Sequence, residues 1–127
     1  MRQVIHSDKA PAAIGPYSQA IGQGDMIFTS GQIPLDPKTG DLVGTEIRAQ
    51  AQQALRNLQA VLEEAGSDFD HVVKTTCFLA DMGDFAAFNE VYSSFIQSAP
   101  ARSCVAVRSL PKGALVEVEC VAVRKQA

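Results

Sequence analysis

Residues 100–123 read PARSCVAVRSLPKGALVEVECVAV, and this stretch predicts two β-strands joined by a short connection. Runs rich in β-branched residues lie on both sides of a Leu-Pro-Lys-Gly sequence at residues 110–113. Proline and glycine at such a position are typical of a turn. The stretch therefore predicts a β-hairpin that folds near Pro111-Lys112.

Chemically active side chains concentrate on this predicted hairpin. Because side chains on a strand alternate between faces, Arg102 and Cys104 share one face of the first strand. Glu117 and Glu119 share a face of the second strand. The opposite face of that strand is apolar throughout, at Val116, Val118, Cys120 and Ala122. If the two strands pair directly, the arginine, the thiol and the two carboxylates lie together on one patch of sheet.

Length and composition limit the classes of protein to consider. The 127 residues fit one domain, 1–127, and 46% of them are hydrophobic. The net charge is −3, and Arg124-Lys125 is the longest basic run, so an electrostatic footprint for nucleic acid is missing. The apolar runs are of strand length, which excludes a membrane span. Three cysteines, at positions 77, 104 and 120, without CxxC spacing argue against disulfides or zinc and favour a reducing cytoplasm.

The remaining sequence predicts strands before and between two helices. Strands are expected at 3–6, 17–21, 26–33 and 72–80, with a turn at 22–25. A helix is expected from about Thr45, its N-cap, to Ala65, with Gly66 ending it. A second helix begins near Asp84 and ends before Pro100. A strand on each side of the first helix predicts a βαβ crossover with a parallel pair. The order βββαβαββ indicates an α+β fold, a mixed sheet with two helices on one face, whose other face needs cover.

Several features permit two interpretations from the residues alone. Gly31, inside a strand, indicates either a bulge or a close approach by a ligand or backbone. Cys104 is either a packed residue or a nucleophile, and it has no neighbouring histidine. The two glutamates have the pattern of ordinary outward strand charges. Arg102 fits a structural ion pair as well as bidentate capture of a substrate carboxylate.

Seven segments together resemble the RidA family (YjgF/YER057c/UK114), the reactive intermediate imine deaminases. They are APAAIGPYSQA at 10–20, IFTSGQIP at 27–34, DPKTG at 36–40, VVKTTCFLAD at 72–81, FNEVY at 88–92, PARS at 100–103 and LPKGALVEVECVAV at 110–123. The resemblance implies a chorismate-mutase-like fold that forms a homotrimer, with sheets inside, helices outside and sites in the clefts between subunits. One departure is the short link from Tyr92 to Arg102, with Ala99 where relatives often have an aromatic residue, which affects the rim of the pocket.

The resemblance also implies roles for individual residues. Arg102 would bind the carboxylate of the substrate and Glu117 would position or activate water. Cys104 would act chiefly through its backbone carbonyl. Four further residues would line the pocket: Tyr17, Ser30, Gly31 and Asn89. Glu119 receives no role. The implied reaction is hydrolysis of 2-iminobutanoate and 2-iminopropanoate, which needs no cofactor or metal because the C=N bond is already activated.

Two other classes of function stay open at this point. Some relatives are described as single-strand endoribonucleases or translation inhibitors, although the acidic charge and the lack of a general-base histidine argue against that activity here. The same cleft would also serve a non-catalytic protein that holds small carboxylates or acts as a chaperone. The sequence does not specify the preferred imine side chain, the enzyme that supplies the imine or the redox state of Cys104.

Overall fold

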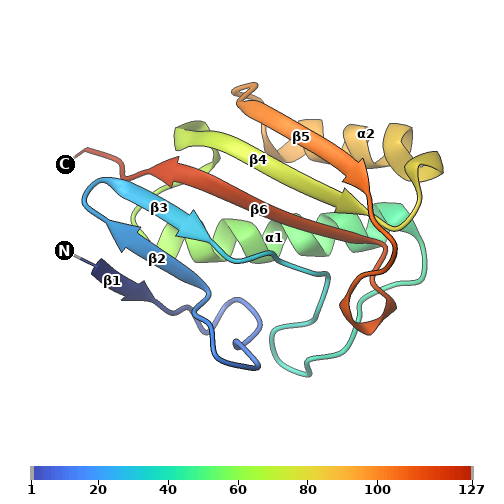
Figure 1. Cartoon of the computed structure of the whole chain (residues 1–127), viewed down its shortest axis with the longest axis horizontal. Helices are drawn as coiled ribbons and strands as arrows, with labels where there is room; N and C mark the ends of the chain where they lie inside the picture. Colours follow the sequence, from blue (N-terminus) through green and yellow to red (C-terminus); the bar gives the residue numbers. More distant parts are fainter. Residues whose placement is uncertain (1, 127) are drawn as a thin grey trace.

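The computed structural model describes residues 2–126, which form a six-stranded mixed sheet with two helices packed on one face (Figure 1). The elements are β1 (Arg2–Ile5), β2 (Ala20–Gln23), β3 (Met26–Thr29), α1 (Ile47–Glu64), β4 (Val72–Leu79), α2 (Phe85–Phe95), β5 (Ala101–Ala106) and β6 (Val116–Val123). Short 3₁₀ turns lie at Phe69–His71, Met82–Asp84 and Pro111–Gly113. The expected order βββαβαββ and the placement of both helices on one face are confirmed.

Helix α1 provides most of the core that covers the sheet. Seven apolar residues that recur at the helical period along this segment are buried: Ile47, Ala51, Leu55, Leu58, Val61, Leu62 and Ala65. The predicted N-cap, Thr45, is wrong by one residue. The Glu46 carboxylate accepts the backbone N–H groups of Arg48 and Ala49 at 2.9 and 2.7 Å, which satisfies two of the four unpaired donors at the helix start. Gly66 follows the helix with φ of 78°, the left-handed conformation that ends it.

The predicted hairpin between β5 and β6 does not form. The strand order is β1-β2-β3-β6-β4-β5, so β4 lies between them. Strand β5 pairs with β4 in parallel, because α2 makes the crossover from β4 to β5. The chain then crosses past the end of β4, and β6 enters antiparallel on the far side of β4. Sequence alternation identified both strands correctly but not their partner.

The parallel pair predicted across α1 is also wrong. Strands β3 and β4 both run antiparallel to β6, which lies between them, so they share a direction without touching. The parallel pair that does form is β4 with β5. Inserting β6 at the centre buries its apolar face, Val116, Val118, Cys120 and Ala122, completely under the helices. The last strand of the chain is therefore the middle of the fold.

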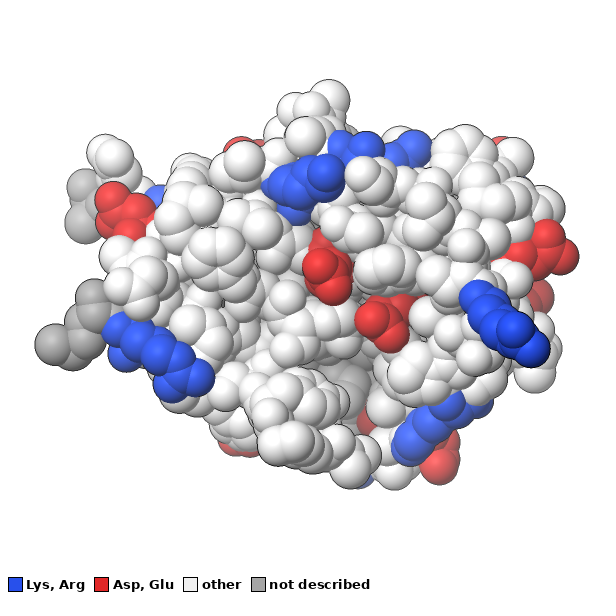
Figure 2. Space-filling model, in the orientation of Figure 1, with Lys and Arg blue, Asp and Glu red and all other residues white. Residues whose placement is uncertain are grey.

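The sheet face opposite the helices is uncovered. Figure 1 shows both helices behind the sheet, and Figure 2, in the same orientation, shows this face as mostly uncharged, with acidic atoms near its centre over β6 and a hollow beside them. Large apolar side chains are about half exposed there, including Val4, Phe28 and Val105. Facing pairs in the strand register place these residues on the same side as Glu117 and Glu119. Within residues 2–126 no helix has the length and apolar character that crossing a membrane requires.

Candidate functional site

Arg102 lies on the helix side of the sheet, at its β5 edge. Its partner in the parallel register is Thr75 of β4, which is fully buried beneath α2. The guanidinium Nη1 of Arg102 donates a hydrogen bond to Asn89 Oδ1 of α2 at 2.7 Å. The guanidinium carbon lies 4.9 Å from the centre of the Tyr92 ring. The structure thus brings together Arg102 and Asn89, two of the predicted site residues.

A cleft of about 590 Å³ opens beside this cation, and we call it the Arg102 cleft. It is lined by Asn89, Tyr92, Ser93, Ile96, Gln97, Ala99, Pro100 and Arg102. Ala99 has φ of 53°, a left-handed conformation that is unusual for a residue other than glycine. This turn directs the chain from the end of α2 into β5. The small side chain of Ala99 lies at the rim of this cleft.

Cys104 follows Arg102 on the same face of β5 and lies opposite Cys77 of β4. It is partly buried against the core, and Cys77 is completely buried. Burial raises the pKa of the Cys104 thiol, and the opposing effect of the Arg102 charge is smaller. A thiol with a raised pKa is a poor nucleophile at neutral pH. The geometry therefore favours the packed interpretation of this side chain over the nucleophilic one.

Glu117 lies on the opposite, uncovered face of the sheet. Its register partner on β4 is Phe78, whose own partner on β5 is the exposed Val105. The expectation that Glu117 and Glu119 share a patch with Arg102 and Cys104 is therefore wrong. The error follows from the hairpin prediction, because inserting β4 between β5 and β6 removes the direct pairing. Within one chain the sheet itself separates the cation from the two carboxylates.

The bulge interpretation of Gly31 is confirmed, and the group that approaches this glycine closely is a side chain, not a ligand or a backbone segment. Phe28 of β3 pairs with Val121 and Gln32 pairs with Val118, so residues 29–31 face only residues 119–120, and the strand bulges. The Glu117 side chain lies directly over the Gly31 backbone. A Cβ atom at position 31 would lie 2.6 Å from its Cδ and 2.9 Å from its Cγ. Only glycine allows the carboxylate to lie there.

The environment of Glu117 favours its protonated form. Partial burial is the larger cause that raises the pKa of this carboxyl, and the like charge of Glu119 adds to it. Glu119 lies two residues along β6 and so on the same face. A carboxyl whose pKa is raised holds a proton more readily than an exposed glutamate, which suits it to taking up and releasing protons during a reaction.

A second pocket, of about 340 Å³, adjoins Glu117 through Gly31, and we call it the Gly31 pocket. Its lining includes Pro11, Ala12, Ile14, Tyr17, Gln19, Gly31, Gln32, Ile33, Leu35, Pro111 and Lys112. Tyr17 is about half exposed, and its hydroxyl accepts a hydrogen bond from the Ile14 backbone N–H at 3.4 Å. Ser30 donates its hydroxyl to the Ser18 carbonyl at 2.6 Å. Ser30 thus ties the bulge to the segment just before β2, next to Tyr17.

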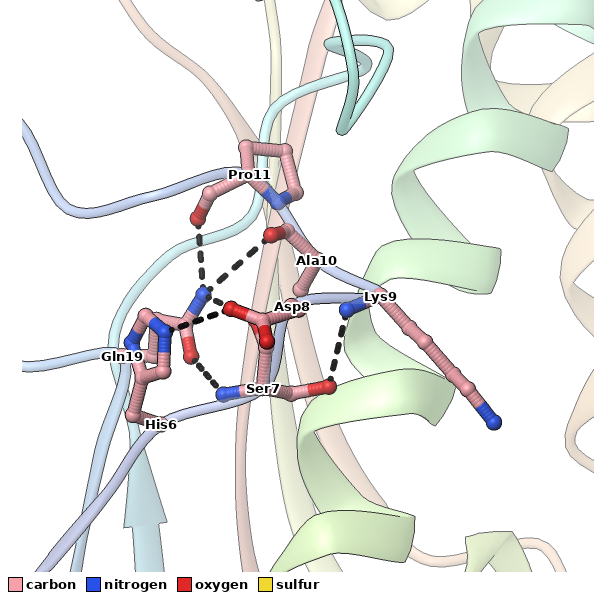
Figure 3. A network of polar contacts seen from close by, with 7 residues as sticks. All are labelled: His6, Ser7, Asp8, Lys9, Ala10, Pro11 and Gln19. Atoms are coloured by element: carbon pink, nitrogen blue, oxygen red, sulfur yellow. Dashed lines mark hydrogen bonds and ion pairs between the residues drawn. The ribbon is translucent and has the colours of Figure 1, made fainter.

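Gln19 holds the wall of the Gly31 pocket, and the sequence assigned it no role. Its side chain is buried and accepts the Ser7 backbone N–H at 2.6 Å. Its amide nitrogen donates to the carbonyls of Ser7 at 3.1 Å and Pro11 at 2.8 Å, as Figure 3 shows. One amide therefore shapes the loop 7–11 that leads into the pocket wall. A glutamine beside a strand start gives no pattern that distinguishes it from a surface residue.

Two polar residues of α1 were also missed, and both anchor the segments that carry Gly31 and Glu117. Asn57 is buried and donates to the carbonyls of Ile33 and Leu35 at 3.1 and 2.9 Å. Gln50 accepts the backbone N–H of Leu115 at 2.8 Å, two residues before Glu117. They are seven residues apart on the helix, so they lie on one face, and that spacing is the signal that the sequence offered.

The predicted site residues fall into two groups on opposite faces. Arg102, Asn89 and Cys104 lie on the helix side at the β5 edge, and Glu117 and Gly31 lie on the uncovered side, with Tyr17 in the adjoining pocket. Among the described residues, no three His, Cys, Asp or Glu side chains gather in a group able to hold a metal ion.

Comparison with known proteins finds similarity over nearly the whole chain. Residues 7–124 match the family described as Endoribonuclease L-PSP. The mouse protein named 2-iminobutanoate/2-iminopropanoate deaminase is 51% identical over 125 residues, covering 98% of this chain and 93% of its own. YyfA of Yersinia pestis, a protein of the conserved Rid family, is 46% identical with a TM-score of 0.94, covering 97% of this chain and 99% of its own. E. coli TdcF, solved with bound serine, is 43% identical with a TM-score of 0.92 and the same coverage.

Proposed function

Because this chain belongs to the RidA (YjgF/YER057c/UK114) family, we propose that it is a hydrolytic deaminase of reactive 2-imino acids. Its sheet and helices have the chorismate-mutase-like fold of that family. The substrates would be 2-iminobutanoate and 2-iminopropanoate, and the products the 2-keto acids and ammonia. The name of the mouse relative supports this substrate class. The observation that carries the proposal is a fixed guanidinium at Arg102 together with a proton-accepting carboxyl at Glu117.

We further propose that the working unit is a homotrimer in which each site lies between two chains. The support is geometric: Arg102 and Glu117 lie on opposite faces of one sheet, so a second copy must bring the missing half. The half-exposed apolar side chains around Glu117 give such a copy a surface to cover. We also propose a cytoplasmic location, since three unbridged cysteines suit a reducing compartment.

In this mechanism Arg102 binds the substrate carboxylate in two-point geometry, which fixes the neighbouring C=N carbon. Glu117 of the adjacent copy takes a proton from water as the water oxygen bonds to that carbon. The same carboxyl passes this proton to the nitrogen, which gives a carbinolamine. It then takes the proton of the new hydroxyl and delivers it to the amino nitrogen, so that the C–N bond breaks and ammonia leaves as the carbonyl forms. Backbone groups at Gly31 and Cys104 orient the water and the imine. Tyr17, Ser30 and Asn89 complete the wall around the substrate.

The test is the variant Arg102→Ala. Loss of a hydrogen bond to a charged group costs about 1.5–3 kcal/mol, so kcat/KM for 2-iminobutanoate falls at least about tenfold. Arg108→Ala, which removes an exposed arginine that lines neither pocket, is the matched control and keeps wild-type activity. Ammonia release by purified Arg102→Ala at the wild-type rate contradicts the assignment.

A second candidate function is cleavage of single-stranded RNA, because the matching family carries the description Endoribonuclease L-PSP. The net charge of −3 gives weak attraction for phosphate backbones. Neither histidine lines the Arg102 cleft or the Gly31 pocket, and His71 is paired with Asp68 at 2.6 Å. Intact RNA after incubation with a nuclease-free preparation removes this candidate.

A third candidate is a non-catalytic protein that holds small carboxylates, favoured by the serine bound to TdcF. It predicts binding of 2-keto acids without faster imine hydrolysis. Measuring both quantities on one preparation separates it from the deaminase.

A further inference from the structure

Arg102 starts from an exposed position at the edge of the sheet, where a long side chain is normally mobile. Its guanidinium is nevertheless held against α2, by Asn89 Oδ1 at 2.7 Å and above the Tyr92 ring at 4.9 Å. The Phe85 ring lies 5.5 Å from the same carbon atom. Both rings lie within the distance at which a cation is attracted to an aromatic face. The three partners follow at intervals of four and three residues, so α2 presents them on one side.

Tyr92 is itself fixed in place. Its side chain is buried, its ring packs against Phe88 with 5.7 Å between centroids, and its hydroxyl lies 2.8 Å from Thr75 Oγ1. Thr75 is fully buried on β4. Burial raises the pKa of the Tyr92 phenol, so it stays protonated at neutral pH. The ring therefore has one orientation relative to the sheet.

Thr75 connects the Tyr92 ring to the strand position beside Arg102. In the parallel register Thr75 is the direct neighbour of Arg102. The Tyr92–Thr75 hydrogen bond thus joins the ring under the guanidinium to the point on the sheet from which the arginine side chain starts. Phenylalanine and valine fill the same volume without a buried polar pair, and such replacements are close to neutral for stability. What the polar pair adds to such an apolar core is a directional hydrogen bond that fixes the Tyr92 ring.

We propose that Tyr92, held by Thr75, is a positioning residue that aims the Arg102 guanidinium at the substrate carboxylate. The inference rests on the proposed carboxylate-binding role of Arg102. Tyr92 touches no reacting atom and acts through the arginine. Its effect is confined to ligands that carry the carboxylate, because the rest of the substrate is held by other residues.

The experiment uses Tyr92→Phe and Thr75→Val, each of which removes one end of the hydrogen bond and keeps the bulk of the side chain. Affinity is measured by calorimetry for 2-ketobutanoate and for its uncharged analogue 2-ketobutanamide. Ser67→Ala is the matched control, because the buried Ser67 hydroxyl donates at 2.6 Å to the Val123 carbonyl, away from both pockets. Thermal unfolding is recorded for every variant.

We expect each variant at 92 or 75 to raise the Kd of 2-ketobutanoate about three- to tenfold and to leave that of 2-ketobutanamide unchanged. The double variant matches either single one, because both remove the same bond. Ser67→Ala changes unfolding but neither Kd. An unchanged Kd in Tyr92→Phe, an equal loss for both ligands, or no binding of 2-ketobutanoate to the wild type overturns the inference. Binding that responds as expected without imine hydrolysis in the wild type leaves it standing and refutes the deaminase proposal instead.

Discussion

Replacing Gly31 by alanine perturbs the candidate site through a single methyl group. The new Cβ would lie 2.6 Å from Glu117 Cδ, whereas ordinary contacts begin at 3.4 Å. The difference requires Cδ to retreat by about 0.8 Å, and the nearer Oε2 by more, unless the backbone moves. The backbone is restrained by the Gln32–Val118 bridge, with hydrogen bonds of 2.8 and 3.1 Å, so the side chain yields.

The size of the effect follows from that displacement. Misplacing a catalytic group by about 1 Å costs up to about 100-fold in rate. For a shift of 0.8 Å we expect kcat/KM of Gly31→Ala to fall about 10- to 100-fold, or about 1.4–2.7 kcal/mol. The thermal midpoint changes little, because the Glu117 side chain is partly exposed and can turn outward.

The assay generates 2-imino acids from amino acids with an oxidase and follows the accelerated disappearance of the imine. Gly83→Ala is the matched control, since Gly83 has an ordinary φ and a Cβ there would meet only Asp81, at 3.2 Å. Wild-type activity in folded Gly31→Ala, or an equal loss in Gly83→Ala, refutes the reasoning.

Three further variants test the electrostatics and the anchors of the site. Glu119→Gln removes the like charge that helps raise the pKa of Glu117, so the acid limb of the kcat/KM profile, where ionised Glu117 is needed, moves to lower pH. Asn57→Leu leaves two buried carbonyls short of a donor, and we expect urea unfolding to show a loss of about 2–3 kcal/mol. Arg124→Ala removes donors to the last turn of α1, at the Ala65 carbonyl, and to the Gly24 carbonyl, and calorimetry is expected to show a loss of about 1–2 kcal/mol with unchanged activity.

The sequence was sufficient for the element order because each element has a local signature. The apolar stripe of α1, the glycine after it and the alternating face of β6 all reflect contacts a few residues apart. Thr45 was predicted as the N-cap because threonine is common at that position. The N-cap is Glu46 instead, whose longer side chain reaches two backbone N–H groups.

The sequence did not predict which strands pair, because alternation identifies a strand and its two faces but not the strand beside it. The segment from β5 to β6 contains a proline-glycine turn, yet it passes the end of β4 instead of making a hairpin. The misplaced carboxylates and the missed anchors Gln50 and Asn57 share this cause. Their roles depend on which distant segments pack beside them, and only the folded topology provides that information.

The separation of Arg102 and Glu117 on two faces of the sheet has a genetic consequence. In the proposed trimer, two inactive variants can complement one another. An Arg102→Ala chain still supplies Glu117, and a Glu117→Ala chain still supplies Arg102. Random mixing of the two inactive proteins after joint refolding gives about one intact cleft in four, because both of its contributors must be of the right kind. Complementation to about a quarter of wild-type activity, from parents that have almost none, is therefore the behaviour of a site divided between copies. A site contained in one chain stays inactive in every mixture.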